Sequence, residues 1–390
     1  MNGEGHDLAV VGAGLVGLSL AYELACLGAT VTVVDAAHPG RATDAGAGIL
    51  SPVTSHETDP ALWPFLHGAG AHYPALLARL AVDDADIDAA GYGACGILSL
   101  GLRATEDEWF APFADIVLRR SPGEVSEITP EEAGALFPPL GPVHRVLHAP
   151  GSARIDGRGM AKVLREGLAA RGVRFVHGAV EGIETEGTVD AGYGGKSTPH
   201  VRALAIRDHE PVGCDAVAVA GGAWTPAAGE WFRCKLPVGP TKGQIVHLGV
   251  EGETTTWPIA QPLLTHYLVP WPGGRVACGG TFEAGAGYST RVTVQGLNEL
   301  LRECLNVAPG LRDATYLETR VGLRPTSADD RALVGRVPGW GNAWVATGHG
   351  ANGLLQGPYS ARVLAHTITS TELPRDEVLL PNSFDPARFG

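Results

Sequence analysis

The chain has 390 residues, and at roughly 150 residues per domain this length predicts two to three domains with a sizeable core. Hydrophobic residues make up 45% and charged residues 18% of the sequence, which excludes an intrinsically disordered chain. With 29 basic and 42 acidic residues the net charge is −13, and no basic cluster is longer than two residues, so we expect no nucleic acid partner.

The cysteines, the N-terminus and the first apolar segment bear on metal binding and location. The six cysteines lie far apart and form no CxxC pair, so we expect a reduced, cytoplasmic protein with no metal site and no disulfide framework. The N-terminus lacks the basic start of a signal peptide. The apolar stretch 8–34 is interrupted by four glycines and by Glu23, so we expect no membrane span.

The first predicted elements, within residues 8–35, are a buried strand, a helix and a second buried strand. The first strand leads into the turn Gly12-Ala13-Gly14-Leu15-Val16-Gly17. Gly12 permits the tight turn, Gly14 lets a pyrophosphate approach backbone N–H groups, and Gly17 lets helix and strand pack closely. Asp35 ends the second strand, where its carboxylate can accept hydrogen bonds from both hydroxyls of an adenosine ribose. This context favours a dinucleotide site over a purely structural turn.

Later glycine-rich segments indicate which dinucleotide is bound. A second GxGxxG spacing, at 91–96, follows no strand and precedes the strand-like run 97–100, so we interpret it as a turn. The sequence lacks a second complete nucleotide-binding unit of the kind that a separate NAD(P)H site needs. Two other predicted strands end in glycine-rich segments, at 221–224 and 348–353, and a helix is predicted after the second. A helix N-terminus beside glycines suits a negatively polarised group, such as the edge of a reduced flavin ring. Together with the missing second unit, this favours a single, extended flavin cofactor.

Several stretches, spread over the whole chain, match a known family in the family's order. They are 10–35, 40–50, 218–224, 266–270, 279–281, 322–325 and 346–355. On these motifs the chain resembles the D-amino-acid oxidase superfamily of flavoproteins, most closely the glycine oxidases of bacterial thiazole biosynthesis. The resemblance implies an α/β fold, with a Rossmann-like FAD-binding domain interleaved with an α+β substrate domain built on a mainly antiparallel sheet. We expect the FAD-binding domain at 1–80, 150–225 and 321–375, the substrate domain at 81–149 and 226–320, and a C-terminal tail at 376–390.

The resemblance also implies which residues bind FAD. Residues 12–15 would lie at the pyrophosphate, Asp35 at the ribose and the backbone of Val180 at the adenine. The other cofactor-binding residues are Val16, Gly17, Arg41, Ala42, Thr43, Ala47, Gly48, Ile49, Gly222, Trp224 and, at the pyrimidine edge of the flavin, His349, Gly350, Ala351, Asn352, Gly353, Leu354 and Leu355. The alternative is that both residues have purely structural roles, with Thr43 capping a turn and Val180 filling the core. Related sarcosine oxidases attach flavin through a cysteine near the position of Arg324, and no cysteine lies within fifteen residues of it here, so we expect non-covalent FAD.

Arg324 and Tyr267 are the residues that we expect to bind substrate and to act in catalysis. An arginine in the apolar, glycine-rich stretch 322–325 needs an anionic partner, because burying an unpaired charge is costly. A substrate carboxylate would be that partner, and an internal ion pair with Asp329 or Glu318 is the alternative. The resemblance assigns Arg324 this role and gives the Tyr267 hydroxyl an assisting one, although Tyr267 could equally be a core residue.

The chain departs from the glycine oxidases at four positions near the implied active site. Ala351 and Trp271 stand where those enzymes have arginines, and Phe282 and Ile49 stand where they have methionines. Lost charge and added aromatic surface predict a substrate bulkier than glycine, unless positions 351 and 271 lie outside the pocket. The expected substrate pocket consists of Arg324, Tyr267, Trp271, Phe282 and Ala351.

The reaction that the resemblance implies is oxidation of an amino acid, glycine or a D-amino acid, by hydride transfer to flavin N5. The resulting imine hydrolyses to an oxo acid, and oxygen is the expected electron acceptor, giving hydrogen peroxide. Alternatives are a sarcosine- or proline-like secondary-amine oxidase, a D-amino-acid dehydrogenase with another acceptor and, in a different class, a flavin-binding protein without turnover. The sequence leaves open whether the protein forms a homo-oligomer.

Overall fold

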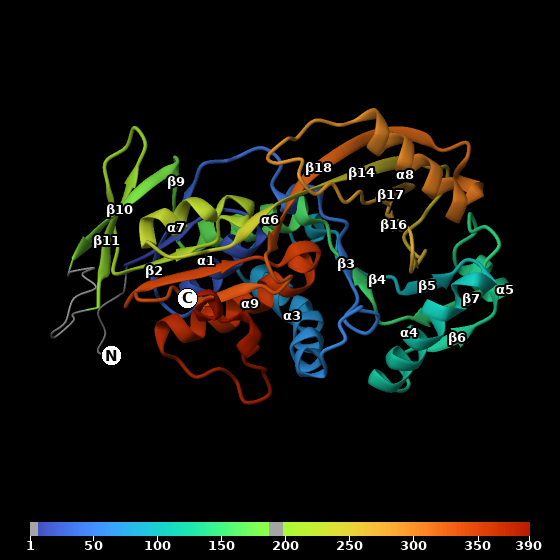
Figure 1. Cartoon of the computed structure of the whole chain (residues 1–390), viewed down its shortest axis with the longest axis horizontal. Coiled ribbons are helices and arrows are strands. Elements are labelled where there is room, and N and C mark those ends of the chain that lie inside the picture. The colour runs from blue at the N-terminus through green and yellow to red at the C-terminus, as the bar shows by residue number, and fades with distance from the viewer. Residues whose placement is uncertain (1–6, 187–197) are drawn as a thin grey trace.

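The computed structural model describes residues 7–186 and 198–390, and two large sheets organise these residues (Figure 1). The first sheet has six strands in the spatial order β19 (Leu333–Arg336), β20 (Ala343–Thr347), β13 (Ala216–Val219), β1 (Asp7–Val11), β2 (Thr30–Asp35) and β9 (Arg174–His177). All neighbouring strands pair in parallel except the edge strand β19, which is antiparallel to β20. A central parallel sheet of this kind is typical of a Rossmann-like nucleotide-binding domain.

Alternation along β1 sends side chains to two separate hydrophobic cores. Leu8 and Val10 pack on one face of the sheet, beneath four helices: α1 (Leu15–Cys26), α3 (Trp63–Val82), α6 (Gly157–Ala170) and α9 (Gly353–Thr369). Ala9 packs on the other face, which is covered by α7 (Pro226–Phe232) and a small sheet. That small sheet consists of β10 (Val180–Glu186), β11 (His200–Ile206) and β12 (Val212–Gly213). Because both faces are covered, β1 can be apolar along its length, as its sequence predicted.

The second large sheet has eight strands and is mainly antiparallel. Its spatial order is β18 (Thr315–Ser327), β14 (Val238–Gly249), β17 (Arg275–Gly279), β16 (Tyr267–Trp271), β15 (Ile259–Pro262), β5 (Ile97–Gly101), β7 (Arg145–Ala149) and β6 (Ser126–Ile128). The pair β15–β5 is its parallel pair. The helices around it are α4 (Asp107–Arg120), α5 (Pro130–Leu136) and α8 (Val294–Val307). Figure 1 shows this sheet on the right and the parallel sheet on the left.

The chain passes between the two sheets several times. A short three-stranded sheet, β3 (Ile49–Leu50), β8 (Ala153–Arg154) and β4 (Gly93–Ala94), lies where it crosses. The GxGxxG spacing at 91–96 falls at β4 and leads into β5 rather than a helix, so it lacks the strand–turn–helix context of a nucleotide-binding motif. The domain boundary expected at 320/321 falls inside β18, which pairs with β14 along its length, while its residues Leu323 and Thr326 also form bridges with Arg41 and His349.

Residues 376–390, expected as a tail, carry two short 3-10 turns and pack on the parallel-sheet half of the molecule. Phe384 is buried and makes an edge-to-face contact with Phe65 of α3, at 5.3 Å between ring centroids. Over residues 7–186 and 198–390, the structure has no helix that combines the length and the apolar character needed to cross a membrane.

Candidate active site

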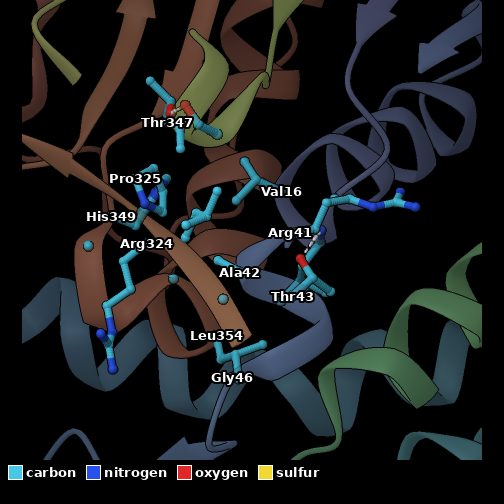
Figure 2. A pocket seen from close by; sticks show the side chains of 18 of the residues that line it. Val16, Arg41, Ala42, Thr43, Gly46, Arg324, Pro325, Thr347, His349 and Leu354 are labelled. Atoms are coloured by element: carbon cyan, nitrogen blue, oxygen red, sulfur yellow. Dashed lines mark hydrogen bonds between the residues drawn. The ribbon is translucent and has the colours of Figure 1, made fainter. Parts of the chain in front are cut away.

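A cavity of about 760 Å³ lies between the carboxyl ends of the parallel strands and one face of the antiparallel sheet. Asp35 and Val180 line one part of it, and Tyr267 and Arg324 line another. Figure 2 shows the side chains of Arg41 and Arg324 extending away from each other. Ligands of open parallel sheets bind outside the carboxyl ends of the strands, which is where this cavity lies.

The turn between β1 and α1 has the close approaches that its glycines predict. Gly12 has φ +105°, and a Cβ there would lie 2.5 Å from the carbonyl oxygen of Ala220. A Cβ at Gly17 would lie 2.0 Å from the carbonyl oxygen of Gly12. Residues 12–16 line the cavity, whereas Gly17 lies behind them as the packing residue between helix and strand. The N-terminus of a helix of this length favours a phosphate group at the mouth of the turn.

Asp35 and Thr43 hold this turn from two sides. The Asp35 carboxylate accepts hydrogen bonds from the Ala13 backbone N–H at 3.0 Å and from Arg41 Nη1 at 3.1 Å. Thr43, in the short helix α2 (Ala42–Ala45), accepts a hydrogen bond from the Leu15 N–H at 2.9 Å and so caps the start of α1. Asp35 is therefore placed at the end of β2 where a ribose would meet it, and Thr43 supports the glycine-rich turn.

The segment around the start of α9 forms another wall of the cavity. Apart from Gly17, all residues predicted to bind FAD line the cavity, including Trp224, Gly48 and residues 349–355. His349 is buried and its Nε2 lies 3.0 Å from the Ser360 hydroxyl. Burial lowers the pKa of His349 to about 4, so the imidazole is neutral at neutral pH. Positive potential at this wall therefore comes from the N-terminus of α9 rather than from His349.

Arg324, on β18, presents a guanidinium that lies close against the backbone. Its Nη1 donates a hydrogen bond to the Thr281 carbonyl at 2.9 Å. Gly243 and Gly280 make room for it, since a Cβ at Gly280 would lie 2.9 Å from Nη2 and one at Gly243 would lie closer still. The sequence analysis missed Gly243, because its role follows from the pairing of β14 with β18 rather than from a motif.

The two acids considered as internal partners of Arg324 bind other arginines. Asp329 pairs with Arg388 at 2.8 Å, and Glu318 pairs with Arg320 at 2.6 Å. Among the residues that the structure describes, no carboxylate lies within 4 Å of the Arg324 guanidinium. Its positive charge is held by a neutral carbonyl and remains available to an anionic ligand in the cavity.

Tyr267 lies beside Arg324 on the face of the antiparallel sheet that lines the cavity. It stands opposite Gly279 of β17, and its hydroxyl would be 3.1 Å from a Cβ at that glycine. Burial raises the pKa of Tyr267 to about 12, despite the opposing effect of the Arg324 guanidinium. The hydroxyl therefore keeps its proton and can donate a hydrogen bond to a carboxylate. Gln261, which lines the cavity on the neighbouring strand β15, was also missed, because only the register between β15 and β16 places it beside Tyr267.

Two residues predicted to line the substrate pocket lie outside the cavity wall. Trp271 lies four residues beyond Tyr267 on β16, about 13 Å along the strand. Its side chain is buried beneath Gly48, and a Cβ added at that glycine would lie 3.1 Å from the ring. Phe282 is 68% exposed, and the Arg324 guanidinium lies 5.9 Å from its ring centroid. The interpretation of these two residues as pocket lining is wrong, and Ala351 does line the cavity.

Comparison with known proteins decides the family. The model of the FAD dependent oxidoreductase family (DAO) matches residues 7–367. The chain belongs to this family. It is 33% identical over 382 residues to the uncharacterized oxidoreductase YurR of Bacillus subtilis (strain 168), covering 97% of this chain and 98% of that one. It is 30% identical over 382 residues to glycine oxidase of Pseudomonas aeruginosa, with the same coverage.

A solved structure supports the same assignment. Iminodiacetate oxidase (IdaA) from Chelativorans sp. BNC1 aligns with a TM-score of 0.82 and 34% sequence identity, over 94% of this chain and 97% of that one. The predicted family, the α/β fold class and the FAD cofactor are confirmed. The protein is an FAD-dependent oxidoreductase that acts on amine groups, and the cavity has the glycine-rich turn, the acidic residue at the end of β2 and the two helix N-termini that suit the cofactor.

Proposed function

We propose that the protein oxidises an α-amino acid, with a primary or an N-substituted amine, to the corresponding imine. The observation that carries this proposal is the Arg324 guanidinium, which faces the cavity, has no acidic partner among the described residues and lies beside the Tyr267 hydroxyl. A guanidinium fork and a neutral phenol together suit a carboxylate, which gains charge-assisted hydrogen bonds from both. A non-catalytic flavin-binding protein would have no use for an unpaired arginine at this position.

The chain's own residues contribute binding and orientation to this reaction. Arg324 and Tyr267 hold the carboxylate and thereby fix the position of the α-carbon relative to the cofactor. FAD, when bound, supplies the acceptor for the two electrons of the α-C–H bond. Correct orientation of this kind can lower the barrier by several kcal/mol without a general acid or base.

The complete reaction balances with oxygen as the electron acceptor. The substrate loses two electrons and two protons to form the imine, and oxygen takes up both to form hydrogen peroxide. Water then hydrolyses the imine to an oxo acid and releases ammonia, or an amine where the substrate was N-substituted. A D-amino-acid dehydrogenase with another acceptor would form the same imine without peroxide.

A secondary amine is the second candidate for the substrate class. The 34% identity to iminodiacetate oxidase favours it, since iminodiacetate carries a secondary amine between two carboxylates. Ala351, which lines the cavity, stands where the glycine oxidases have an arginine, and its smaller, uncharged side chain favours a substrate larger than glycine. Trp271 and Phe282 no longer support a bulkier substrate, because neither lines the cavity.

We propose that FAD is bound non-covalently, because no cysteine is found among the described residues that line the cavity. Acid precipitation of purified protein should release all the flavin, and flavin retained in the pellet would contradict this. Steady-state rates with glycine, sarcosine, D-alanine, D-proline and iminodiacetate test the substrate class. Peroxide formed with at least one of them supports an oxidase, whereas turnover only with an artificial acceptor supports a dehydrogenase.

A further inference from the structure

We propose that Glu283 and Lys242 form a positioning pair that holds the guanidinium of Arg324 in its carboxylate-binding orientation. The pair lies outside the cavity wall and acts through the intervening residue Thr281. This inference rests on the proposed function only in that it takes Arg324 to be the carboxylate-binding residue.

The first link is the segment that carries Thr281. The Thr281 carbonyl accepts the hydrogen bond from Arg324 Nη1, while its hydroxyl donates to Glu283 Oε1 at 2.7 Å. The same hydroxyl accepts a hydrogen bond from the Gln244 backbone N–H at 2.9 Å, and the Thr281 N–H donates to the Gln244 carbonyl at 3.1 Å. The carbonyl that positions Arg324 is therefore fixed on both sides, by β14 and by the Glu283 carboxylate.

The second link is the Glu283 carboxylate itself. Its Oε2 accepts a hydrogen bond from Lys242 Nζ at 2.9 Å, and its Oε1 accepts one from Gln244 Nε2 at 2.6 Å. Lys242 is 1% exposed, so its ammonium depends on Glu283 for compensation. Burial favours the neutral acid, but hydrogen bonds from Gln244, Lys242 and Thr281 outweigh it and hold the pKa of Glu283 below its usual range.

The alternation of β14 explains why this pair does not compete with the substrate. Gly243 lines the cavity, so its neighbours Lys242 and Gln244 point to the opposite face of the strand. There the ammonium and the carboxylate neutralise each other, and the group of this segment that accepts a hydrogen bond from Arg324 is the uncharged Thr281 carbonyl. Loss of Lys242 would leave an unpaired carboxylate two residues from Thr281. That carboxylate would attract the guanidinium and weaken its hold on the substrate.

The test compares holoenzyme variants by binding of propionate, a carboxylate that has no amine to oxidise. Thr281→Val removes the hydroxyl that joins Glu283 to the segment, and Glu283→Gln removes the charge that compensates Lys242. We expect both to raise the Kd for propionate, measured by the change in flavin absorbance, and the KM for the best amino acid by about tenfold. The kcat should change less, by about threefold or below, because substrate that does bind still reaches the cofactor.

Matched variants distinguish positioning from general damage. Glu303 has a similar set of partners, Thr265 and Arg302, and none of its hydrogen bonds among the described residues reaches Thr281, so Glu303→Gln should bind propionate as the unmodified enzyme does. Thr281→Ser keeps the hydroxyl and should restore the Kd. If Glu283→Gln fails to fold, Thr281→Val, which keeps both charges, decides the question.

The variant Arg324→Leu distinguishes failure of the proposed function from failure of the positioning pair. If this variant still binds propionate, Arg324 is not the carboxylate site and the proposed function fails at that residue. If Arg324→Leu loses propionate binding while Thr281→Val keeps the unmodified Kd and KM, the proposed function stands and the positioning pair is wrong.

Discussion

The guanidinium of Arg324 lies directly against the backbone of Gly243 on the neighbouring strand. A Cβ at position 243 would be 2.3 Å from Nη1 and 2.7 Å from Cζ, which is closer than real Cβ contacts come. The two residues are brought together by the antiparallel pairing of β14 and β18, in which Gly243 stands opposite Gly322. The absence of a side chain at Gly243 is thus a condition for the position of Arg324.

Gly243→Ala should therefore displace the guanidinium and impair catalysis while leaving FAD binding intact. We expect kcat/KM for the best amino acid to fall by a factor of about 10 to 100, corresponding to about 1–3 kcal/mol of lost transition-state binding. Gly239→Ala, on the same strand, is the matched control, because no atom lies within 4 Å of a Cβ there. Equal activity of the two variants would show that Arg324 does not need its present position.

Arg324→Leu should lower kcat/KM for a carboxylate substrate, because the charge-assisted contact and the orientation it enforces are both lost. The decrease should correspond to about 2–5 kcal/mol of lost transition-state stabilisation. The absorbance spectrum of bound flavin should stay nearly unchanged. Arg312→Leu serves as control, since Arg312 donates to the Pro309 carbonyl and does not line the cavity. Activity close to that of the unmodified enzyme in Arg324→Leu would assign the arginine a structural role.

Asp35→Ala should weaken retention of FAD, because the ribose loses a charged acceptor worth about 1–3 kcal/mol. The substitution also frees the Ala13 N–H and Arg41, which now bind the carboxylate. Titration of apoprotein with FAD gives the Kd, and Asp115→Ala, on an exposed part of α4, gives the control. An unchanged Kd for FAD would place the ribose elsewhere.

Stability should fall as the pH drops from about 6.5 toward 4, because buried histidines resist protonation in the folded state. Burial lowers the pKa of His349 to about 4, and it does the same for His72 although nearby Glu23 opposes the shift. In the unfolded chain these groups take up protons below about 6.5, so each contributes stability above that pH and loses up to about 1.4 kcal/mol per pH unit below it.

Urea unfolding of the holoenzyme at pH 7.5 and pH 5 measures this effect as a difference in the free energy of unfolding. Both pH values lie above the range in which the Glu23 carboxylate, whose pKa is held low by Arg79 and Arg362 against the effect of burial, is protonated. His72→Gln should reduce the difference, provided that the variant folds. A free energy of unfolding that is the same at both pH values would contradict the assignment of neutral, buried histidines.

The cofactor half of the site was predictable because its signals are local. Gly12, Gly17 and Asp35 fall within one strand–helix–strand unit, in which each backbone requirement follows from the spacing of neighbouring residues. The alternation and apolar character of β1 likewise depend only on its two covered faces.

The substrate half depends on pairing between strands far apart in sequence, which no local pattern specifies. Trp271 points to the same face of β16 as Tyr267 but lies too far along the strand to reach the cavity. Its difference from the arginine of the glycine oxidases therefore did not indicate a residue of the cavity wall. Gly243 and Gln261 acquire their roles from the registers β14–β18 and β15–β16. The extent of β18, which continues past the expected boundary at 320/321, likewise follows from its pairing with β14 and not from a local pattern.

The most direct test of amino-acid oxidation is anaerobic mixing of the yellow holoenzyme with pairs of compounds that differ only in a carboxylate. Suitable pairs are D-alanine with ethylamine, glycine with methylamine, and sarcosine with dimethylamine. We predict that at least one amino acid bleaches the flavin absorbance rapidly and that its decarboxylated partner does so far more slowly, because Arg324 and Tyr267 have no group to hold. Bleaching by an amine as fast as by its amino acid, or no bleaching by any amino acid, would contradict the proposed function.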